Sequence, residues 1–100
     1  MSYQTELLFQ TENLREYEVE KKGCFYPDRV VVADKTQTIF LLTTYDVDQV
    51  PEDYRHFVQE LGGETFALSV NYIPVFFGGD YDDVVRVLDQ FADQLKEDYQ

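Results

Sequence analysis

The amino-acid sequence predicts an α+β fold, with an antiparallel sheet of about four to six strands and two helices packed on one face. Segments of alternating or β-branched apolar residues follow one another with few residues between them, and strands joined by such short turns pair antiparallel. Two further segments, residues 51–61 and 81–99, carry apolar residues at helical spacing instead. The 100 residues, 44% of them apolar, suffice for a single domain over residues 1–100 with its own core.

The predicted strands lie at residues 5–10, 16–22, 29–33, 38–44, 65–70 and 72–77. The first of them is too short to distinguish a strand from a helical turn. In the second, Tyr17 and Val19 alternate with glutamates, which is typical of a strand with one solvent-exposed face. Asp34 begins a hairpin turn between the third and the fourth strand. Because Pro74 cannot donate a hydrogen bond to a neighbouring strand, we expect the last strand at a sheet edge or with a bulge.

Each predicted helix has a start signal and an apolar stripe. Pro51 suits the first position of a helix, and the glycine pair at residues 62–63 ends that segment. Asp80 is a good N-cap residue for the second helix, and further aspartates occupy its first turn. The two stripes consist of Tyr54, Phe57, Val58 and Leu61, and of Tyr81, Val84, Val85, Leu88, Phe91, Ala92, Leu95 and Tyr99.

Negative charge is distributed unevenly along the chain, which has a formal net charge of -12. Residues 1–45 hold 7 acidic and 5 basic side chains, whereas residues 46–100 hold 13 acidic and 3 basic ones. A field of one sign repels nucleic acid and anionic membranes and attracts basic protein surfaces. We therefore expect no direct binding of nucleic acid or membrane. The expected partner is a basic protein, such as a nuclease or another nucleic-acid-binding protein.

Targeting signals and cysteine usage predict a cytoplasmic protein. The first residues contain no basic segment followed by an apolar one, and the longest apolar run is far shorter than the roughly 18 residues that a membrane span needs. Cys24 is the only cysteine, so no intramolecular disulfide can form. We expect it to be a small buried apolar residue.

The sequence shows no convincing catalytic or metal-binding motif. His56 is the only histidine, lies off the apolar stripe of the first predicted helix, and has no evident nucleophile to activate. The aspartates that begin at Asp80 imitate the start of a calcium loop, but Val85 and Phe91 occupy the positions that require Gly and Glu. One cysteine and one histidine do not make a zinc site. We expect no catalytic residues, metal or cofactor, and no enzymatic activity.

The acidic residues of the second half are the remaining functional signal. Asp89, Asp93 and Glu97 follow one another at i+4 spacing, where like charges about 5–6 Å apart destabilise a helix slightly. If both helices pack on one sheet face, their acids form one broad anionic patch that can stand in for phosphates in a Lys/Arg groove, with tyrosines as anchors. The residues predicted to bind the partner are Asp46, Asp48, Glu52, Asp53, Glu60, Asp82, Asp89, Asp93 and Glu97, with Tyr45 and Tyr72.

In size and charge the chain resembles small acidic inhibitors encoded by phages and mobile elements, including anti-CRISPR proteins and DNA mimics. It is also similar in kind to immunity proteins that neutralise nuclease toxins. The resemblance is one of composition. It implies a non-catalytic inhibitor that binds a nucleic-acid-processing protein, such as a CRISPR effector or a nuclease, and blocks its basic surface by charge mimicry.

Other interpretations stay open at this point. The acids could serve only to keep a small protein soluble, or to adapt it to high salt. Alternatively, the protein could be an interaction module or a homodimer that pairs through the edge strand at residues 72–77. A small enzyme or ligand-binding protein is the remaining class. Salt separates the first two interaction modes, because charge-driven binding weakens with salt far more than strand pairing does.

Overall fold

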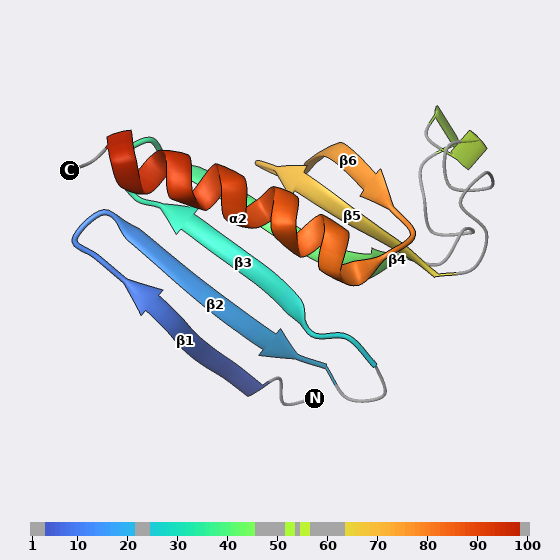
Figure 1. Cartoon of the computed structure of the whole chain (residues 1–100), viewed down its shortest axis with the longest axis horizontal. Helices are drawn as coiled ribbons and strands as arrows, with labels where there is room; N and C mark the ends of the chain where they lie inside the picture. Colours follow the sequence, from blue (N-terminus) through green and yellow to red (C-terminus); the bar gives the residue numbers. More distant parts are fainter. Residues whose placement is uncertain (1–3, 22–24, 46–51, 54, 57–63, 99–100) are drawn as a thin grey trace.

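The computed structural model describes residues 4–21, 25–45, 52–53, 55–56 and 64–98. Its strands are β1 (Gln4–Gln10), β2 (Leu14–Glu20), β3 (Asp28–Ala33), β4 (Thr38–Tyr45), β5 (Thr65–Val70) and β6 (Ile73–Gly78). They form one 6-stranded sheet in the order β1-β2-β3-β4-β5-β6, with every neighbouring pair antiparallel. Helix α2 (Tyr81–Asp98) lies along one face of the sheet (Figure 1). The α+β prediction is thereby confirmed.

Tight turns explain why consecutive strands are neighbours. Between β5 and β6, Asn71 and Tyr72 have φ angles of 49° and 69°, which gives the turn the twist that a two-residue hairpin requires. Asn71 also fastens this hairpin to β4: its backbone N–H donates to the Ile39 carbonyl at 2.8 Å, and its side-chain oxygen accepts from the Ile39 N–H at 2.9 Å. The predicted turn that begins at Asp34 is confirmed between β3 and β4.

The core lies mainly between α2 and strands β3–β6. The pairing of the strands arranges the core residues of the sheet in rows, because Val31 is opposite Phe40 and Leu42 is opposite Leu68. The predicted apolar stripe of the final helix covers these rows. The core consists of Leu14, Val31, Ala33, Phe40, Leu42, Phe66 and Leu68 from the sheet, and of Val84, Leu88 and Ala92 from α2.

The start of α2 is fixed by a cap and by a close approach to β6. The predicted N-cap is confirmed, because the Asp83 backbone N–H donates to the Asp80 carboxylate at 3.2 Å. At Gly78, a Cβ atom would lie only 2.6 Å from Cγ2 of Val84. Glycine is therefore what allows the helix to pack this tightly against the end of β6.

Both margins of the sheet carry irregularities that edge strands commonly have. The prediction for the last strand is confirmed: β6 is an edge strand, contains Pro74, and has a bulge in its pairing with β5 between Leu68 and Ser69. The opposite edge, β1, also has a register shift, between Leu7 and Phe9. The sequence left open whether residues 5–10 form a strand or a helical turn, and the structure shows that they form a strand.

The face assignment expected for the second strand needs a correction. The alternation is present, but Glu16 is opposite Val31, a core residue, so the glutamates of β2 take the side of the sheet on which α2 lies. Tyr17 and Val19 occupy the other side. Glu16 is only 8% exposed instead of facing solvent. The strand-to-strand register, which the local pattern does not contain, decides this.

The prediction of two helices on one sheet face is not supported. The part of the chain that is described contains one long helix, α2, packed on the sheet. Of the predicted helix at residues 51–61, the described residues 52–53 and 55–56 are helical, and the short green ribbon they form lies beyond the end of the sheet in Figure 1. The apolar stripe expected for that helix lies outside the described residues.

Candidate protein-interaction surface

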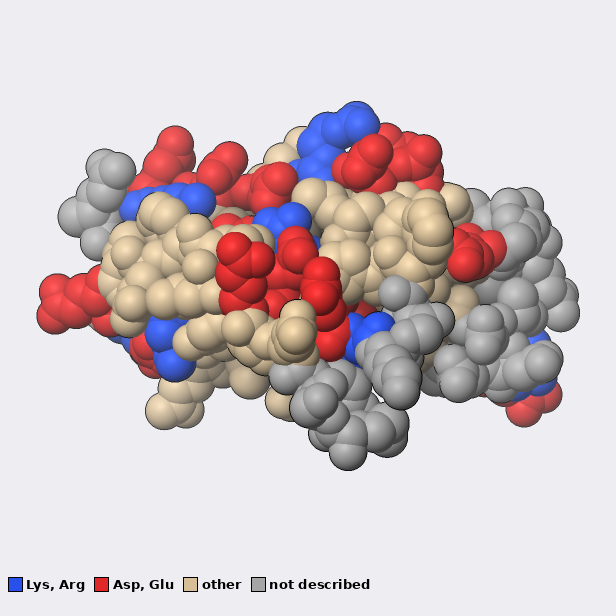
Figure 2. Space-filling view, turned by 90° about the horizontal axis from the view of Figure 1, so that it is seen from below, with Lys and Arg blue, Asp and Glu red and all other residues tan. Residues whose placement is uncertain are grey.

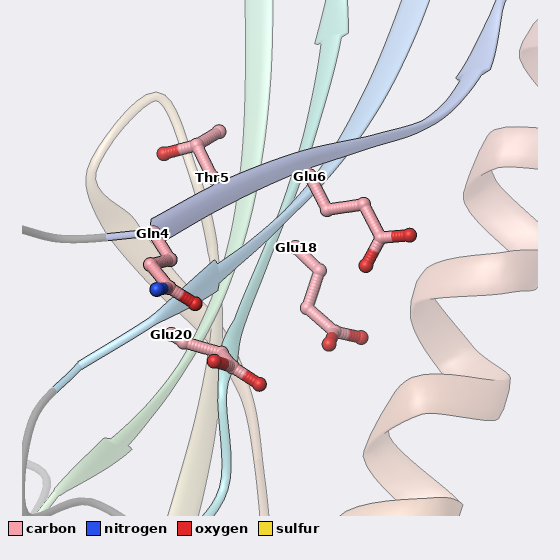
Figure 3. Close-up of a pocket in the computed structure, with 5 residues that line it drawn as sticks. All are labelled: Gln4, Thr5, Glu6, Glu18 and Glu20. Atoms are coloured by element: carbon pink, nitrogen blue, oxygen red, sulfur yellow. The ribbon is translucent and has the colours of Figure 1, made fainter.

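Helix α2 packs mainly over β3–β6 and leaves most of the sheet margin formed by β1 and β2 uncovered. On the α2 side of this margin, Gln4 is directly opposite Glu20 and Glu6 is directly opposite Glu18. Figure 3 shows the carboxylates of Glu6, Glu18 and Glu20 on one side of the two strands, while Thr5 lies on the other. Like charges at directly opposed positions of a strand pair destabilise the sheet. The sequence therefore places acids here at a cost to the fold.

An open hollow of about 370 Å³ lies beside these strands and is lined by residues Gln4, Thr5, Glu6, Glu18 and Glu20. Ionised carboxylates only accept hydrogen bonds, and the one amide of the group can both donate and accept. Such a lining suits a cationic group with several donors, as on the side chains of Lys and Arg.

Arg29 connects the acids of the sheet with those of the helix. Its guanidinium donates to the Glu16 carboxylate and lies 3.9 Å from the Asp89 carboxylate of α2. Burial disfavours the charged form of Arg29, but the hydrogen bond and the charge of Glu16 outweigh it, and the pKa of Arg29 rises above its ordinary value. The Glu16–Arg29 pair is largely buried, with side chains 10% and 15% exposed.

The acids of α2 continue the anionic surface on the helix. Asp82, Asp89, Asp93 and Glu97 are exposed, and their spacing places them in one stripe. This stripe is on the flank toward β1–β3, because Asp89 approaches Arg29 and the Lys96 ammonium lies 4.1 Å from the ring centre of Phe9. Burial raises the pKa of Asp89, as do Glu16 and Asp93, while Arg29 lowers it less than these effects raise it.

Sheet and helix together form one surface, which we call the acidic face: Glu6, Glu18, Glu20, Asp82, Asp89, Asp93 and Glu97, with the largely buried Glu16–Arg29 pair between its two parts. Figure 2, which views the molecule from the β1 side, shows acidic side chains at the centre and along the upper margin, with a few basic ones between them. Among the cations near these acids, Arg29 is paired with Glu16, and Lys96 lies 3.7 Å from Asp93. The acids of the acidic face outnumber these two cations, which therefore offset only part of the charge.

The residues predicted to bind the partner are only partly brought together. Four of them, Asp82, Asp89, Asp93 and Glu97, belong to the acidic face. Glu52 and Asp53 are exposed but lie in the green segment beyond the end of the sheet (Figure 1), away from that face. Asp46, Asp48 and Glu60 lie outside the described residues.

Neither predicted tyrosine anchor lies on the acidic face. Tyr45 is opposite Thr65, at a position whose side chain lies on the sheet face away from α2. It is partly buried. Tyr72 is 73% exposed in the turn before β6, at the sheet edge farthest from β1. The expectation of a single patch around two helices is therefore not supported.

Sequence reasoning missed Glu6, Glu18 and Glu20 as members of this surface. The alternation of β2 predicts a solvent-exposed face that contains Glu18 and Glu20, but it carries no information on Glu6, which lies in β1. Only the register with β3 shows that the glutamates share a side of the sheet with the helix acids.

Other chemistry finds little support among the described residues. No group of three or more His, Cys, Asp or Glu side chains in this part of the chain is arranged to hold a metal ion. No described helix is both long and apolar enough to cross a membrane. His56 is exposed, as expected, and Cys24 lies outside the described residues. Comparisons with protein-family models, with curated proteins and with solved structures find no match to this chain.

Proposed function

We propose that the protein is a non-catalytic acidic inhibitor. It binds a nucleic-acid-processing protein, such as a nuclease or a CRISPR effector, and its acidic face occupies the basic surface that otherwise binds nucleic acid. The observation that carries this proposal is the continuity of the carboxylates from β1 and β2, through the Glu16–Arg29–Asp89 contact, onto α2. A surface of one sign, extended over two elements, attracts a complementary surface and repels a similar one.

The arrangement of the charges also supports mimicry of a nucleic acid. Carboxylates recur about every 6–7 Å along β2 and about every 6 Å along α2, from the rise of a strand and of a helix. In Figure 1, β2 and α2 run along the same diagonal, so the two rows are roughly parallel. A duplex likewise presents two rows of negative charge to a protein. The hollow beside Glu18 gives one basic side chain of the partner a defined seat.

The internal cost of these charges favours a role beyond solubility. Glu6 and Glu18 oppose each other across β1 and β2, and Asp89, Asp93 and Glu97 are spaced i+4 on α2. Acids that only maintain solubility can be spread so that they do not repel one another. A basic partner that binds here relieves the repulsion between these acids. The free energy that this repulsion costs the fold therefore favours complex formation.

The proposal is tested by charge reversal with a matched control. The test variant carries Glu6→Lys, Glu20→Lys and Asp93→Lys, and the control carries Glu12→Lys, Glu52→Lys and Asp53→Lys; all six residues are exposed. Both variants change the net charge equally, but only the first alters the acidic face. Each is used as bait in a lysate of the source cells at low and high salt, and bound proteins are identified by mass spectrometry.

The wild type and the control are expected to capture the same basic nucleic-acid-binding protein at low salt, and the test variant is expected to lose it. High salt should weaken capture by the wild type. The captured protein should then lose its nucleic acid when the wild type is added. Equal capture by all three baits, or capture that high salt leaves intact, would overturn the proposal.

A second candidate function is the interaction module at residues 72–77. The specific observation in its favour is that β6 lies at the sheet edge with Ile73 and Val75 62% and 52% exposed. Pro74 and the adjacent bulge, however, are devices that discourage the addition of a further strand. A partner at this edge is thus expected to contact side chains more than backbone.

A further inference from the structure

The sheet margin opposite the acidic face carries a group of exposed apolar side chains, which we call the apolar edge. Its members are Tyr72, Ile73, Val75 and Phe76 of the last hairpin and Phe91 of α2, with exposed fractions of 73%, 62%, 52%, 38% and 41%. Single exposed apolar residues are ordinary, whereas a gathered set that includes aromatic rings is typical of an interface.

Register and a ring contact place three of these side chains, Ile73, Phe76 and Phe91, on the α2 side. Ile73 is opposite Val70, and Val70 is opposite Phe40. The ring of Phe91 stacks on that of Phe40 at 5.4 Å between centroids. Phe76 is opposite the core residue Leu68, in the neighbouring row. Because the acids of α2 face β1–β3, Phe91 lies on the other flank of the helix, toward β5 and β6.

The apolar edge is also free of charge. Residues 65–79, which include all of β5 and β6, contain no charged side chain, although 28% of the chain is charged. A basic protein would therefore find no ion-pair partner in this hairpin. An anionic lipid surface would be repelled by a protein of net charge -12. The occupant that fits is another apolar, uncharged protein surface.

We propose that the apolar edge is the interface of a symmetric homodimer. A second copy supplies an identical uncharged surface, and a two-fold axis lets Ile73, Phe76 and Phe91 of each copy pack against those of the other. This arrangement also keeps like charges apart. Five strand spacings of about 4.8 Å separate β6 from β1, which exceeds a Debye length of about 8–10 Å.

The acids closest to the apolar edge on α2 are consistent with this arrangement. Asp83 is paired with Arg86 at 2.7 Å, and Asp98, near the end of the helix, accepts a hydrogen bond from the Gln94 amide at 3.1 Å. Repulsion between two copies is therefore modest at this margin, and added salt should strengthen the dimer slightly. The binding of a basic partner to the acidic face responds to salt in the opposite direction, so the two associations can be told apart.

The test measures the molar mass of the purified full chain by size-exclusion chromatography with light scattering and by sedimentation equilibrium. The variant Ile73→Glu places a charge in the proposed interface. Leu7→Glu is the matched control, because Leu7 is 48% exposed on the opposite edge strand β1. A second interface variant, Phe76→Lys, covers the case in which Ile73→Glu does not fold, and circular dichroism establishes folding for each protein.

Wild type and Leu7→Glu are expected to have about twice the chain mass of 11.8 kDa, unchanged or more fully dimeric at high salt. Ile73→Glu and Phe76→Lys are expected to be monomeric, with dimer dissociation constants raised at least about tenfold. A monomeric wild type at about millimolar concentration, including one that captures another protein through this edge, would overturn the proposal. Dimers that persist in both interface variants would overturn it as well. Neither result depends on whether the acidic face binds an inhibited partner.

Discussion

The two flanks of α2 face solvent with opposite chemistry. Toward β1 and β2 the helix presents Asp89 and Asp93 beside the glutamates of β2, whereas toward β6 it presents Phe91 beside Ile73 and Phe76. Both flanks exist because α2, the one long helix among the described residues, covers only part of the six-stranded sheet and leaves most of a margin open on each side. The two associations that we propose therefore both use these margins.

The separation of acidic and apolar side chains between the two flanks depends first on how α2 packs on the sheet. Leu88 of α2 is fully buried in the core. Its replacement by Ala should lower the free energy of unfolding by about 2–5 kcal/mol, because packing is lost and a cavity is left. Urea denaturation of Leu88→Ala and of the exposed control Gln90→Ala measures this. The control should change stability by less than about 0.5 kcal/mol. A small effect of Leu88→Ala would mean that α2 does not hold the two flanks in place.

The next largest effect is expected at the contact between helix and sheet acids. Arg29→Met leaves the buried carboxylate of Glu16 without its partner, which should cost about 2–3 kcal/mol. Adding Glu16→Gln should recover part of this loss, so a double-mutant cycle on thermal or urea unfolding should show clear coupling. The control Arg15→Met breaks the exposed pair with Asp34 and should cost less than about 1 kcal/mol. Equal costs for the two arginines would contradict the assigned role of Arg29.

On the other flank, the close packing of β6 against α2 can be tested at a single atom. In Gly78→Ala the new methyl would overlap Cγ2 of Val84 unless helix or strand moves, so we expect a loss of about 1–3 kcal/mol. If the proposed dimer uses the relative position of β6 and Phe91, its dissociation constant should rise too. Stability and molar mass that both stay at the wild-type values would show that this approach has no structural role.

Much of this architecture follows from local patterns. The strands from β3 to β6, the Asp80 cap and the apolar face of α2 could be predicted because alternation, turn residues and helical spacing are local properties. The side taken by Glu16 and its neighbours could not, since it depends on the register with β3. The extent of sheet that α2 covers is likewise set by long-range packing. For this reason the sequence predicts the acids that α2 contributes to the acidic face, but not those that the sheet contributes.

A smaller effect is expected at Asp89, whose raised pKa carries a definite sign. A carboxyl group that binds its proton more tightly in the folded state destabilises the fold while it is ionised, above its folded pKa, and this penalty disappears as the pH falls through that pKa. Asp89→Asn should therefore raise the free energy of unfolding slightly at neutral pH, by no more than about 0.5 kcal/mol for a half-exposed side chain. The gain should vanish in acid. A loss of stability at neutral pH would show that the attraction to Arg29 dominates instead.

Two-dimensional ¹⁵N NMR of the full-length protein compares both flanks in one measurement. Titration with an arginine-rich peptide at low salt should shift the amide signals of Glu6, Glu18, Glu20 and Asp93. Simple dilution should instead shift the amide signals of residues 72–73, 75–76 and 91. The account predicts two separate sets of signals, with salt suppressing only the first. Peptide-induced shifts spread evenly over the molecule, or concentrated at residues 72–76, would contradict the division of the molecule into an acidic face and an apolar edge.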